Sequence, residues 1–398
     1  MISVSDALQR IEAEISPLQK IDIELRHALQ YVLAEDLFAT IDSPPFAQSA
    51  MDGYAFRFED LQTQNIFPVQ DQVQAGDTRS IFLQQKQCIR IFTGAPIPQG
   101  ADTVIMQEHT KSSSEGIRFL SLPTESGANV RLQGSQIKKG SLIGQQGHQL
   151  NPASMGYFAG FGFEKIRVFD RPRVAIIITG QELVKPGNEL QHGQVYESNS
   201  VMLEAALQEG GFEKPRIFYA EDTLEATMQA LETAMASVDV VLLTGGISVG
   251  DFDFVSMAMD ECGIEKILYK VKQKPGKPFC FGKRKGNLIF ALPGNPASVF
   301  TCFCEYVVPA LRKLKGLPFL PNNRVRAQLT SPYSKKAGLT HFVKAKQIGS
   351  EVSILEGQES YKLSAFVTAN ALVSLPEEST QWQTGDCVEV HTLDALWT

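Results

Sequence analysis

The chain has 398 residues, more than one hydrophobic core usually serves, so we expect two to four domains. Its hydrophobic content of 43% can give each domain a core, which excludes a chain that is disordered throughout. The formal net charge of -7 comes from acidic residues spread along the chain, so the bulk charge attracts neither nucleic acid nor a membrane, and any anion site must be local.

The N-terminal segment MISVSDALQRIEAEI has the pattern of an amphipathic helix capped by Ser5. It contains no uninterrupted apolar stretch, so we expect no signal peptide, and no later run is long enough to cross a membrane. The six cysteines form no C-x-x-C pair and have no metal-ligand spacing with the six histidines. We therefore expect reduced thiols in a reducing compartment.

Residues 43–139 carry many Gly, Pro, Gln and Ser residues between short apolar runs, as in a small β-rich domain. Segments 20–42 and 140–169 flank it and are expected to build one linking domain together. Two motifs lie inside the β-rich part, SAMDGYA around Asp52 and TGAPIPQGAD around Thr93. Spacing alone predicts no more than turns made by glycine and proline.

From residue 172 to about residue 316, short β-branched runs alternate with helical periods, which predicts a parallel sheet wrapped by helices. The near-continuous apolar runs VVLLT and LIFAL predict strands that are buried on both faces. The predicted strands are 173–179, 216–220, 238–244, 265–272 and 287–292. The predicted helices are 201–211 with Asn199 as its cap, 223–237, and one from Asn295 and Pro296 to about Lys315.

The strongest local signal is VDVVLLTGGISVGDFDF, a buried strand that breaks into glycines and leads to a helix near Asp253. Glycine lets the backbone approach a ligand, and the helix N-terminus presents free N–H groups to an anion. In doubly wound sheets the carboxyl ends of the strands form the ligand edge. An ordinary turn explains one glycine, but it explains less well the set Gly245, Gly246, Gly250, Asp251 and Asp253.

Three lysines, Lys270, Lys272 and Lys274, alternate along the predicted strand in YKVKQKPGKPF, so they are expected on one face. Lysines on an edge strand can simply deter aggregation. Because a Pro-Gly turn follows at once and brings in Lys277, a bound oxyanion or phosphate is the favoured interpretation.

Carboxylates also follow the predicted strands. Glu182 and Asp222 each come directly after one, and together with Asp253 they would offer the hard oxygen ligands that Mg²⁺ prefers when it bridges phosphates. The turn LPGNPAS reaches the same edge of the sheet. Asn295 there is most simply a helix N-cap with Pro296 as the first helical residue, and a ligand role for this backbone is additional.

Taken together, SAMDGYA, TGAPIPQGAD, TGQELVKPG, TGGISVGDFDF, KPGKPF and LPGNPAS closely resemble, in order, the motifs of the molybdopterin molybdenumtransferase family, the bacterial MoeA type related to the gephyrin E domain. The resemblance covers essentially the whole chain. It implies a multidomain α/β protein: a doubly wound, MoaB/Mog-like molybdopterin-binding domain, β-rich domains and a C-terminal β-barrel. The implied domains are 1–19 with 170–318 (α/β), 20–42 with 140–169 (linking), 43–139 (β-rich) and 319–398 (barrel).

The resemblance also implies a reaction. The expected enzyme inserts molybdenum into adenylylated molybdopterin with release of AMP, a late step of molybdenum cofactor biosynthesis, with molybdate as the second substrate and Mg²⁺ as cofactor. A cytoplasmic homodimer is implied, with the active site between the α/β domain of one subunit and the β-rich domain of the other. A molybdopterin adenylyltransferase and acceptor molybdoenzymes are the expected partners, whereas nucleic acid and membranes are not.

Residue roles carry over motif by motif, with Asp52 and Thr93 reaching in from the partner subunit. The implied catalytic residues are Asp52, Thr93, Glu182, Asp222, Asp253, Lys270 and Lys274. The implied metal ligands are Glu182, Asp222 and Asp253. The implied substrate contacts are Gly245, Gly246, Ser248, Gly250, Asp251, Lys277, Pro278, Pro293, Gly294, Asn295, Pro296, Lys344 and Ser360.

The C-terminal segment departs from the family pattern. Where the family often has an arginine that grips molybdate, GLTHFVKAK has Lys344, which keeps the charge but loses the bidentate fork. Ser360 in ESYKLSAF matches the companion serine. The resemblance therefore implies an oxyanion pocket that is weakened or retuned.

Two other functions stay open. A molybdopterin adenylyltransferase, which acts one step earlier, shares the α/β domain, but the DGYA and TGAP segments argue against it. A non-catalytic molybdopterin-binding scaffold would keep the fold and the ligand. The complete acidic set of Glu182, Asp222 and Asp253 argues against a loss of turnover. Lys344, in place of the usual arginine, is compatible with such a loss.

Overall fold

The computed structural model describes residues 1–247, 254–320, 324–394 and 396–397. The chain divides into two compact units. Unit 1 comprises residues 1–34, 147–151 and 165–398, and unit 2 comprises residues 35–146 and 152–164. Both segments predicted to build the linking domain are divided between the units. Their strands β1 (Lys20–Glu24), β14 (Lys165–Phe169) and β2 (Val32–Leu33) form a three-stranded antiparallel sheet in unit 1.

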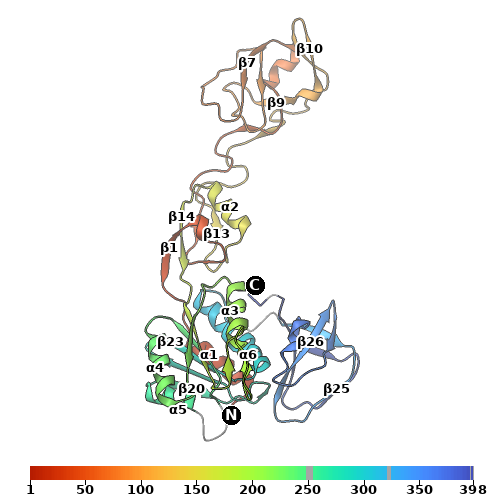
Figure 1. The fold of residues 1–398 in the computed structure, drawn as a ribbon. Helices are drawn as coiled ribbons and strands as arrows, with labels where there is room; N and C mark the ends of the chain where they lie inside the picture. The colour runs from red at the N-terminus through yellow and green to blue at the C-terminus, as the bar shows by residue number, and fades with distance from the viewer. Residues whose placement is uncertain (248–253, 321–323, 395, 398) are drawn as a thin grey trace. The chain divides into compact units, whose positions relative to one another are not determined.

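A six-stranded sheet in the order β18-β15-β19-β23-β22-β20 forms the centre of unit 1 (Figure 1). Four of its strands pair in parallel: β18 (Arg216–Ala220), β15 (Val174–Thr179), β19 (Val240–Thr244) and β23 (Asn287–Leu292). Parallel strands bring their carboxyl ends to one edge, which is the edge predicted to bind a ligand.

The prediction of a wholly parallel sheet is wrong for one strand. β22 (Cys280–Arg284), which the sequence pattern did not single out, runs antiparallel to both β23 and β20 (Glu265–Tyr269). Only Lys285 and Gly286, both with positive φ, connect β22 to β23. A two-residue hairpin turn reverses the chain, whereas a parallel connection needs a long crossover.

Alternate residues of β19 and β23 face two separate cores, so the predicted burial of these strands on both faces is confirmed, and β15 shows the same alternation. Ile176 and Ile178 join one core with residues of α1, α3, α6 and α7. Ala175 and Ile177 join the other core with residues of α4 and α5. Figure 1 shows these two helix groups on opposite sides of the sheet.

Helix starts follow local capping, with two corrections. α1 (Val4–Ala13) is capped by Ser3 rather than Ser5, because Ser3 Oγ accepts from the Asp6 N–H at 3.0 Å. α3 (Asn199–Glu209) contains Asn199 as a helical residue, and Glu197 Oε1 accepts the Ser200 N–H at 2.7 Å instead. The other helices of unit 1 are α4 (Leu224–Met235), α5 (Phe254–Glu261), α6 (Pro296–Cys302) and α7 (Val308–Leu314).

The long helix predicted from Asn295 is present but interrupted. A π turn, Phe303–Val307, separates α6 from α7. It turns Glu305 and Tyr306 inward, and both are fully buried. Such turns are rare and often occur at functional sites.

The predicted C-terminal barrel is confirmed. Five strands close on themselves in the order β26-β27-β24-β30-β28, with β28 pairing back to β26. They are β24 (Arg324–Leu329), β26 (Thr340–Ile348), β27 (Glu351–Ile354), β28 (Ala371–Leu375) and β30 (Cys387–Thr392). A short strand from the α/β part, β21 (Gln273–Lys274), pairs in parallel with β26. The shorter elements of unit 1 are β16 (Leu183–Val184), β17 (Val195–Tyr196), β25 (Tyr333–Ser334), β29 (Gln381–Trp382) and the 3₁₀ helices Leu25–His27 and Leu363–Val367.

Unit 2 is β-rich, with a four-stranded sheet in the order β7-β8-β5-β9 and a three-stranded sheet in the order β10-β11-β6. The strands of these sheets are β5 (Gly53–Phe56), β6 (Ile66–Phe67), β7 (Val69–Val73), β8 (Cys88–Ile91), β9 (Thr103–Met106), β10 (Thr110–Ser113) and β11 (Gly116–Phe119). Its other elements are β3 (Leu37–Phe38), β4 (Gln48–Ser49), β12 (Val130–Arg131), β13 (Leu142–Gly144), α2 (Pro152–Gly160) and the 3₁₀ helices Phe58–Gln62 and Gln107–His109.

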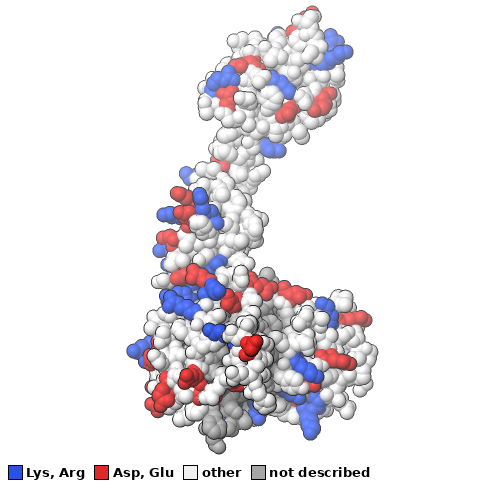
Figure 2. All heavy atoms as spheres, viewed as in Figure 1, with Lys and Arg blue, Asp and Glu red and all other residues white. Residues whose placement is uncertain are grey.

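Acidic and basic side chains are interspersed on the face drawn in Figure 2, and neither sign covers it as one field. No helix in the part of the chain that the structure describes is both long enough and apolar enough to cross a membrane.

Candidate functional site

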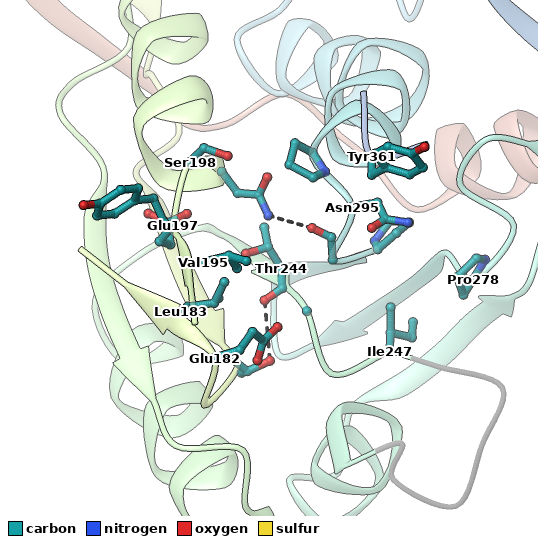
Figure 3. Close-up of a pocket in the computed structure, with 17 residues that line it drawn as sticks. Glu182, Leu183, Val195, Glu197, Ser198, Thr244, Ile247, Pro278, Asn295 and Tyr361 are labelled. Atoms are coloured by element: carbon teal, nitrogen blue, oxygen red, sulfur yellow. Dashed lines mark hydrogen bonds between the residues drawn. The ribbon is translucent and has the colours of Figure 1, made fainter. Parts of the chain in front are cut away.

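A pocket of about 530 Å³ lies at the carboxyl ends of β15, β19 and β23 (Figure 3). Its volume is in the usual range for a small-molecule site. Strand-end residues Thr179 and Thr244 line it, as does Glu182 just beyond β15. The pocket therefore lies at the sheet edge where the sequence predicted a ligand.

The first wall of the pocket is the glycine turn after β19. Gly245 has a φ of +90°, and a Cβ on it would lie 2.3 Å from the Thr179 carbonyl oxygen. Only glycine therefore allows the close approach of this turn to β15. Gly245 lines the pocket, and Gly246 follows it with a φ of +63°. The remaining predicted residues of this turn, Ser248, Gly250, Asp251 and Asp253, lie outside the described residues.

The second wall is the turn LPGNPAS. The four residues predicted from it, Pro293, Gly294, Asn295 and Pro296, all line the pocket. Asn295 occupies the N-cap position of α6 but makes no side-chain capping bond. Its Nδ2 donates instead to Ser360 Oγ of the C-terminal barrel at 2.9 Å. The predicted N-cap position of Asn295 is confirmed, with Pro296 in the first turn, but the side chain of Asn295 binds a residue distant in sequence instead of a backbone N–H of the helix.

Glu182 and Asp222 lie near one another at this edge. Burial, and then the negative charge of Glu182, raise the pKa of Asp222 above its ordinary value. Asp222 Oδ1 is buried and has no hydrogen-bond partner among the described residues. A cation between the two carboxylates would offset their mutual repulsion and would give the buried Asp222 Oδ1 a partner. The donor set therefore fits a hard divalent ion such as Mg²⁺. The described residues contain no cluster of three metal-binding side chains.

The predicted one-sided row of lysines is wrong, because β20 ends at Tyr269. Lys270 takes a positive φ of 65°, and its ammonium lies 4.5 Å from the centre of the Tyr269 ring. Lys272 pairs with Glu377 of the barrel, at 2.9 Å. The strand that resumes at Gln273 joins the barrel rather than the central sheet.

Lys274 and Lys277 both stay exposed on the loop KPGKPF. The next residue, Pro278, lines the pocket together with Gly245. No lysine is among the lining residues that the structure describes, so this loop borders the pocket rather than filling it. Buried Gln273 stabilises the loop, since its Nε2 donates to the carbonyls of Pro275 and Gly276 at 3.1 and 3.3 Å.

Lys344 has no free donor for an anion. Its side chain is 1% exposed, and its ammonium donates to the carbonyls of Gly357, Glu359 and Lys362 at 2.6, 3.2 and 3.0 Å. An ammonium has three N–H groups, and these three bonds use them all. This geometry leaves the predicted oxyanion contact of Lys344 without a donor, whereas Ser360 does lie beside the pocket turn.

The sequence interpretation missed several lining residues. Asn199 donates through Nδ2 to the Gly294 carbonyl at 3.0 Å, and its Oδ1 is buried without a partner among the described residues. Thr244 Oγ1 is also buried and has no hydrogen-bond partner among the described residues. The polar end of the apolar run VVLLT was a signal for Thr244. No local pattern signalled Tyr361, because it reaches the pocket from the barrel.

In unit 2, the two separately predicted motifs meet. Asp52 Oδ1 accepts from the Thr93 N–H at 2.8 Å and from the Thr93 hydroxyl at 2.9 Å. These bonds hold the pKa of Asp52 below its ordinary value, and the charge of Arg90 adds to them. The outcome is an exposed, ionised carboxylate with one oxygen committed to Thr93.

Three family models match the chain. The MoeA N-terminal region (domains I and II) matches residues 2–162, a probable molybdopterin binding domain matches residues 175–313, and the MoeA C-terminal region (domain IV) matches residues 326–393. Among curated relatives, a molybdopterin molybdenumtransferase of Staphylococcus epidermidis is 33% identical, over 98% of this chain and 95% of the relative. One of Staphylococcus aureus is 32% identical, over 100% and 96%.

Solved structures agree with these matches. A molybdopterin biosynthesis MoeA protein from Pyrococcus horikoshii superimposes with a TM-score of 0.84 at 30% identity, covering 99% of both chains. A molybdenum cofactor biosynthesis protein from Pyrococcus furiosus gives a TM-score of 0.60 at 20% identity, over 98% of this chain and 99% of that one, which is a likeness of fold alone.

Proposed function

This chain belongs to the MoeA family of molybdopterin molybdenumtransferases and acts in molybdenum cofactor biosynthesis, and we propose that it inserts molybdenum from molybdate into adenylylated molybdopterin with release of AMP. The observation that carries the proposal is the pocket at the carboxyl ends of β15, β19 and β23. Two backbone turns and Glu182 line it, and Asp222 lies near Glu182, a combination that suits a substrate with phosphate groups.

The reaction brings two anions together, the oxyanion and the phosphoanhydride of the pterin. Their mutual repulsion must be offset by cationic groups at the pocket. Lys274 and Lys277, both exposed beside Pro278, are the described lysines that we assign to this role. Lys270 is assigned a supporting electrostatic role from the turn before them.

Glu182 and Asp222 would hold Mg²⁺, with Asp253 as the third carboxylate implied by the family resemblance. The buried, unpartnered Asp222 Oδ1 supports this assignment. The ion, when bound, would neutralise phosphoanhydride charge as the bond to AMP breaks. The two carboxylates would hold it at the sheet edge, next to the pocket that Glu182 lines.

We further propose that the working enzyme is a homodimer, in which Asp52 and Thr93 of one subunit complete the pocket of the other. The exposure of this pair supports the proposal, as does a carboxylate oxygen of Asp52 that Thr93 leaves unbound. The lowered pKa of Asp52 keeps that carboxylate ionised at neutral pH.

The proposed location is the cytoplasm. All six cysteines are free thiols, and five of them are buried, which suits a reducing compartment. An adenylyltransferase must supply the adenylylated pterin, and a molybdoenzyme that lacks its cofactor must take up the product. These two enzyme classes are therefore the proposed partners.

The test uses the purified protein with adenylylated molybdopterin, Mg²⁺ and molybdate, and it follows the release of AMP. We expect AMP only when all components are present, and we expect loss of release on chelation of Mg²⁺ or in Asp222→Asn. Accumulation of adenylylated pterin from ATP and molybdopterin would instead identify an adenylyltransferase. Pterin binding without any AMP release would identify a scaffold.

A further inference from the structure

We propose that Lys344 is a positioning residue whose buried ammonium holds residues 357–362 of the barrel, here called the pocket lip, and so places Ser360 and Tyr361 at the substrate pocket. The proposal rests on the proposed function only for the identity of the substrate. It gives Lys344 a role other than direct contact with the oxyanion.

The bonds of Lys344 all end on the lip. Its ammonium bridges the carbonyls of Gly357, Glu359 and Lys362, which span the lip from one end to the other. Because these acceptors are spaced along six residues, one side chain determines the curvature of the whole segment. Charge-assisted hydrogen bonds of this kind are about twice as strong as neutral ones.

A second residue closes the same clamp. Gln358 accepts the Lys344 backbone N–H through Oε1 at 3.0 Å, and it donates through Nε2 to the Lys344 carbonyl at 2.8 Å and to the Leu355 carbonyl at 2.7 Å. Both the backbone and the side chain of Lys344 are therefore tied to the lip. On the solvent side, Lys362 pairs with Glu359 at 2.9 Å.

The held lip touches the α/β part at the start and on the side of α6. Ser360 Oγ accepts from Asn295 Nδ2 at 2.9 Å, at the N-terminus of the helix. Just after the lip, Phe366 packs edge-to-face against Phe300, with ring centres 5.0 Å apart. The Lys344 ammonium lies 5.6 Å from the centre of that Phe366 ring. Lys344 therefore supports both the Ser360–Asn295 hydrogen bond and the Phe366–Phe300 contact from the barrel side.

Tyr361 is the residue that the lip presents to the pocket. It lines the pocket although its side chain is 63% exposed, and Figure 3 shows it beside Asn295. An exposed aromatic ring at the rim of a pocket offers a flat surface on which a planar heterocycle can stack. The pterin or the adenine of the substrate has this shape, so Tyr361 is assigned the stacking contact.

The geometry also explains why a lysine suits this position. Three carbonyl oxygens converge on one ammonium, whose donors point in three directions. A planar guanidinium fork matches a carboxylate or oxyanion better than it matches three separate carbonyls. Arginine at position 344 would therefore disturb the lip, whereas it would improve a direct oxyanion contact.

The first experiment measures the dissociation constant of adenylylated molybdopterin by calorimetry in Lys344→Met, Lys344→Arg and Tyr361→Ala. We expect each to weaken binding about tenfold, and the Lys344→Met Tyr361→Ala double variant to be no weaker than either single variant. The matched control is Lys346→Met, an exposed lysine on the same strand, which should bind as the wild type does. Tighter binding of adenylylated molybdopterin by Lys344→Arg than by the wild type, or additive losses in the double variant, would overturn the proposal.

The second experiment measures amide hydrogen exchange of residues 357–362 without substrate. We expect faster exchange in Lys344→Met and unchanged exchange in Lys346→Met. Equal protection in both would contradict the proposal. Neither experiment needs turnover. An absence of AMP release in the wild type would therefore refute the proposed reaction, but the role of Lys344 could still be tested. Tyr361→Ala removes a ring that is 63% exposed, so we expect its melting temperature to equal that of the wild type and its binding loss to report the contact with the substrate.

Discussion

His391 of β30 is buried between two carboxylates. Its Nδ1 lies 2.9 Å from Glu305 Oε1, and its Nε2 lies 3.0 Å from Glu389 Oε1. Burial lowers the pKa of His391, but the charge of Glu305 and the hydrogen bonds with both carboxylates outweigh burial and raise the pKa to about 9. Because Glu305 belongs to the π turn, this single imidazolium joins the barrel to the α/β part.

We expect His391 and its two carboxylate partners to make the stability of the protein depend on pH. The folded pKa of about 9 exceeds the ordinary value of 6.5, so the contribution is complete below pH 6.5 and disappears as the pH rises through 9. One unit of pKa difference corresponds to about 1.4 kcal/mol, so the contribution of His391 to the free energy of unfolding is on the order of 3 kcal/mol. Urea unfolding at pH 6 and pH 10 should show a larger loss for the wild type than for His391→Gln. If the free energies of unfolding of the wild type and His391→Gln changed equally with pH, the prediction would be wrong.

Gly245 is a residue that tolerates no side chain. We expect Gly245→Ala to lower the free energy of unfolding by about 2 kcal/mol more than Gly263→Ala, because its Cβ would meet the Thr179 carbonyl oxygen. Gly263 is a matched control, since it also has a positive φ but nothing lies within 4 Å of the position that a Cβ would take there. Chemical denaturation of both variants tests the difference. Equal losses would mean that strain in φ alone explains the effect.

At the scale of elements, the π turn connects the C-terminal barrel with the loop KPGKPF, which borders the pocket. Glu305 binds His391 of the barrel, and the neighbouring Tyr306 hydroxyl donates to Gln273 Oε1 at the base of the loop KPGKPF. A Cβ on Gly276 in that loop would lie 2.4 Å from Cys302 Sγ. The loop therefore packs against α6 and the π turn.

The two exposed lysines of this loop should act on the substrate and not on stability. We expect Lys274→Met and Lys277→Met each to raise the KM for molybdate roughly tenfold, the size of one lost charge-assisted contact. The melting temperature should stay unchanged. Lys285→Met, in the turn before β23, serves as a control for the loss of one surface charge. An unchanged KM in both variants would remove these lysines from the site.

At the scale of the whole molecule, the proposed homodimer makes a quantitative prediction. Asp52→Asn and Asp222→Asn should each inactivate the homodimer, because one alters the contribution of unit 2 and the other that of unit 1. If each pocket takes these residues from different subunits, dissociation and random reassembly of the two variants restores one pocket in each mixed dimer. We expect about a quarter of wild-type AMP release. No recovery in mixed dimers would mean that each subunit supplies both residues.

Sequence by itself determined the elements that depend on local patterns. Apolar runs between turn residues located β15, β18, β19 and β23. The two pocket turns could be placed as well, since glycines and prolines directly after parallel strands must lie at one sheet edge. The ordered motifs identified the family, because six matches in one order rarely arise by chance.

Tertiary structure decided what depends on partners distant in sequence. Asn295 occupies the predicted N-cap position, but only the fold shows that its side chain binds Ser360. Lys344 resembled an anion ligand, but three carbonyls of the pocket lip accept its N–H donors. The lysine strand stopped at Tyr269 because its continuation pairs with the barrel. A periodic pattern records which face a side chain takes, but hydrogen-bond partners follow from the packing of separate elements, which no local window contains.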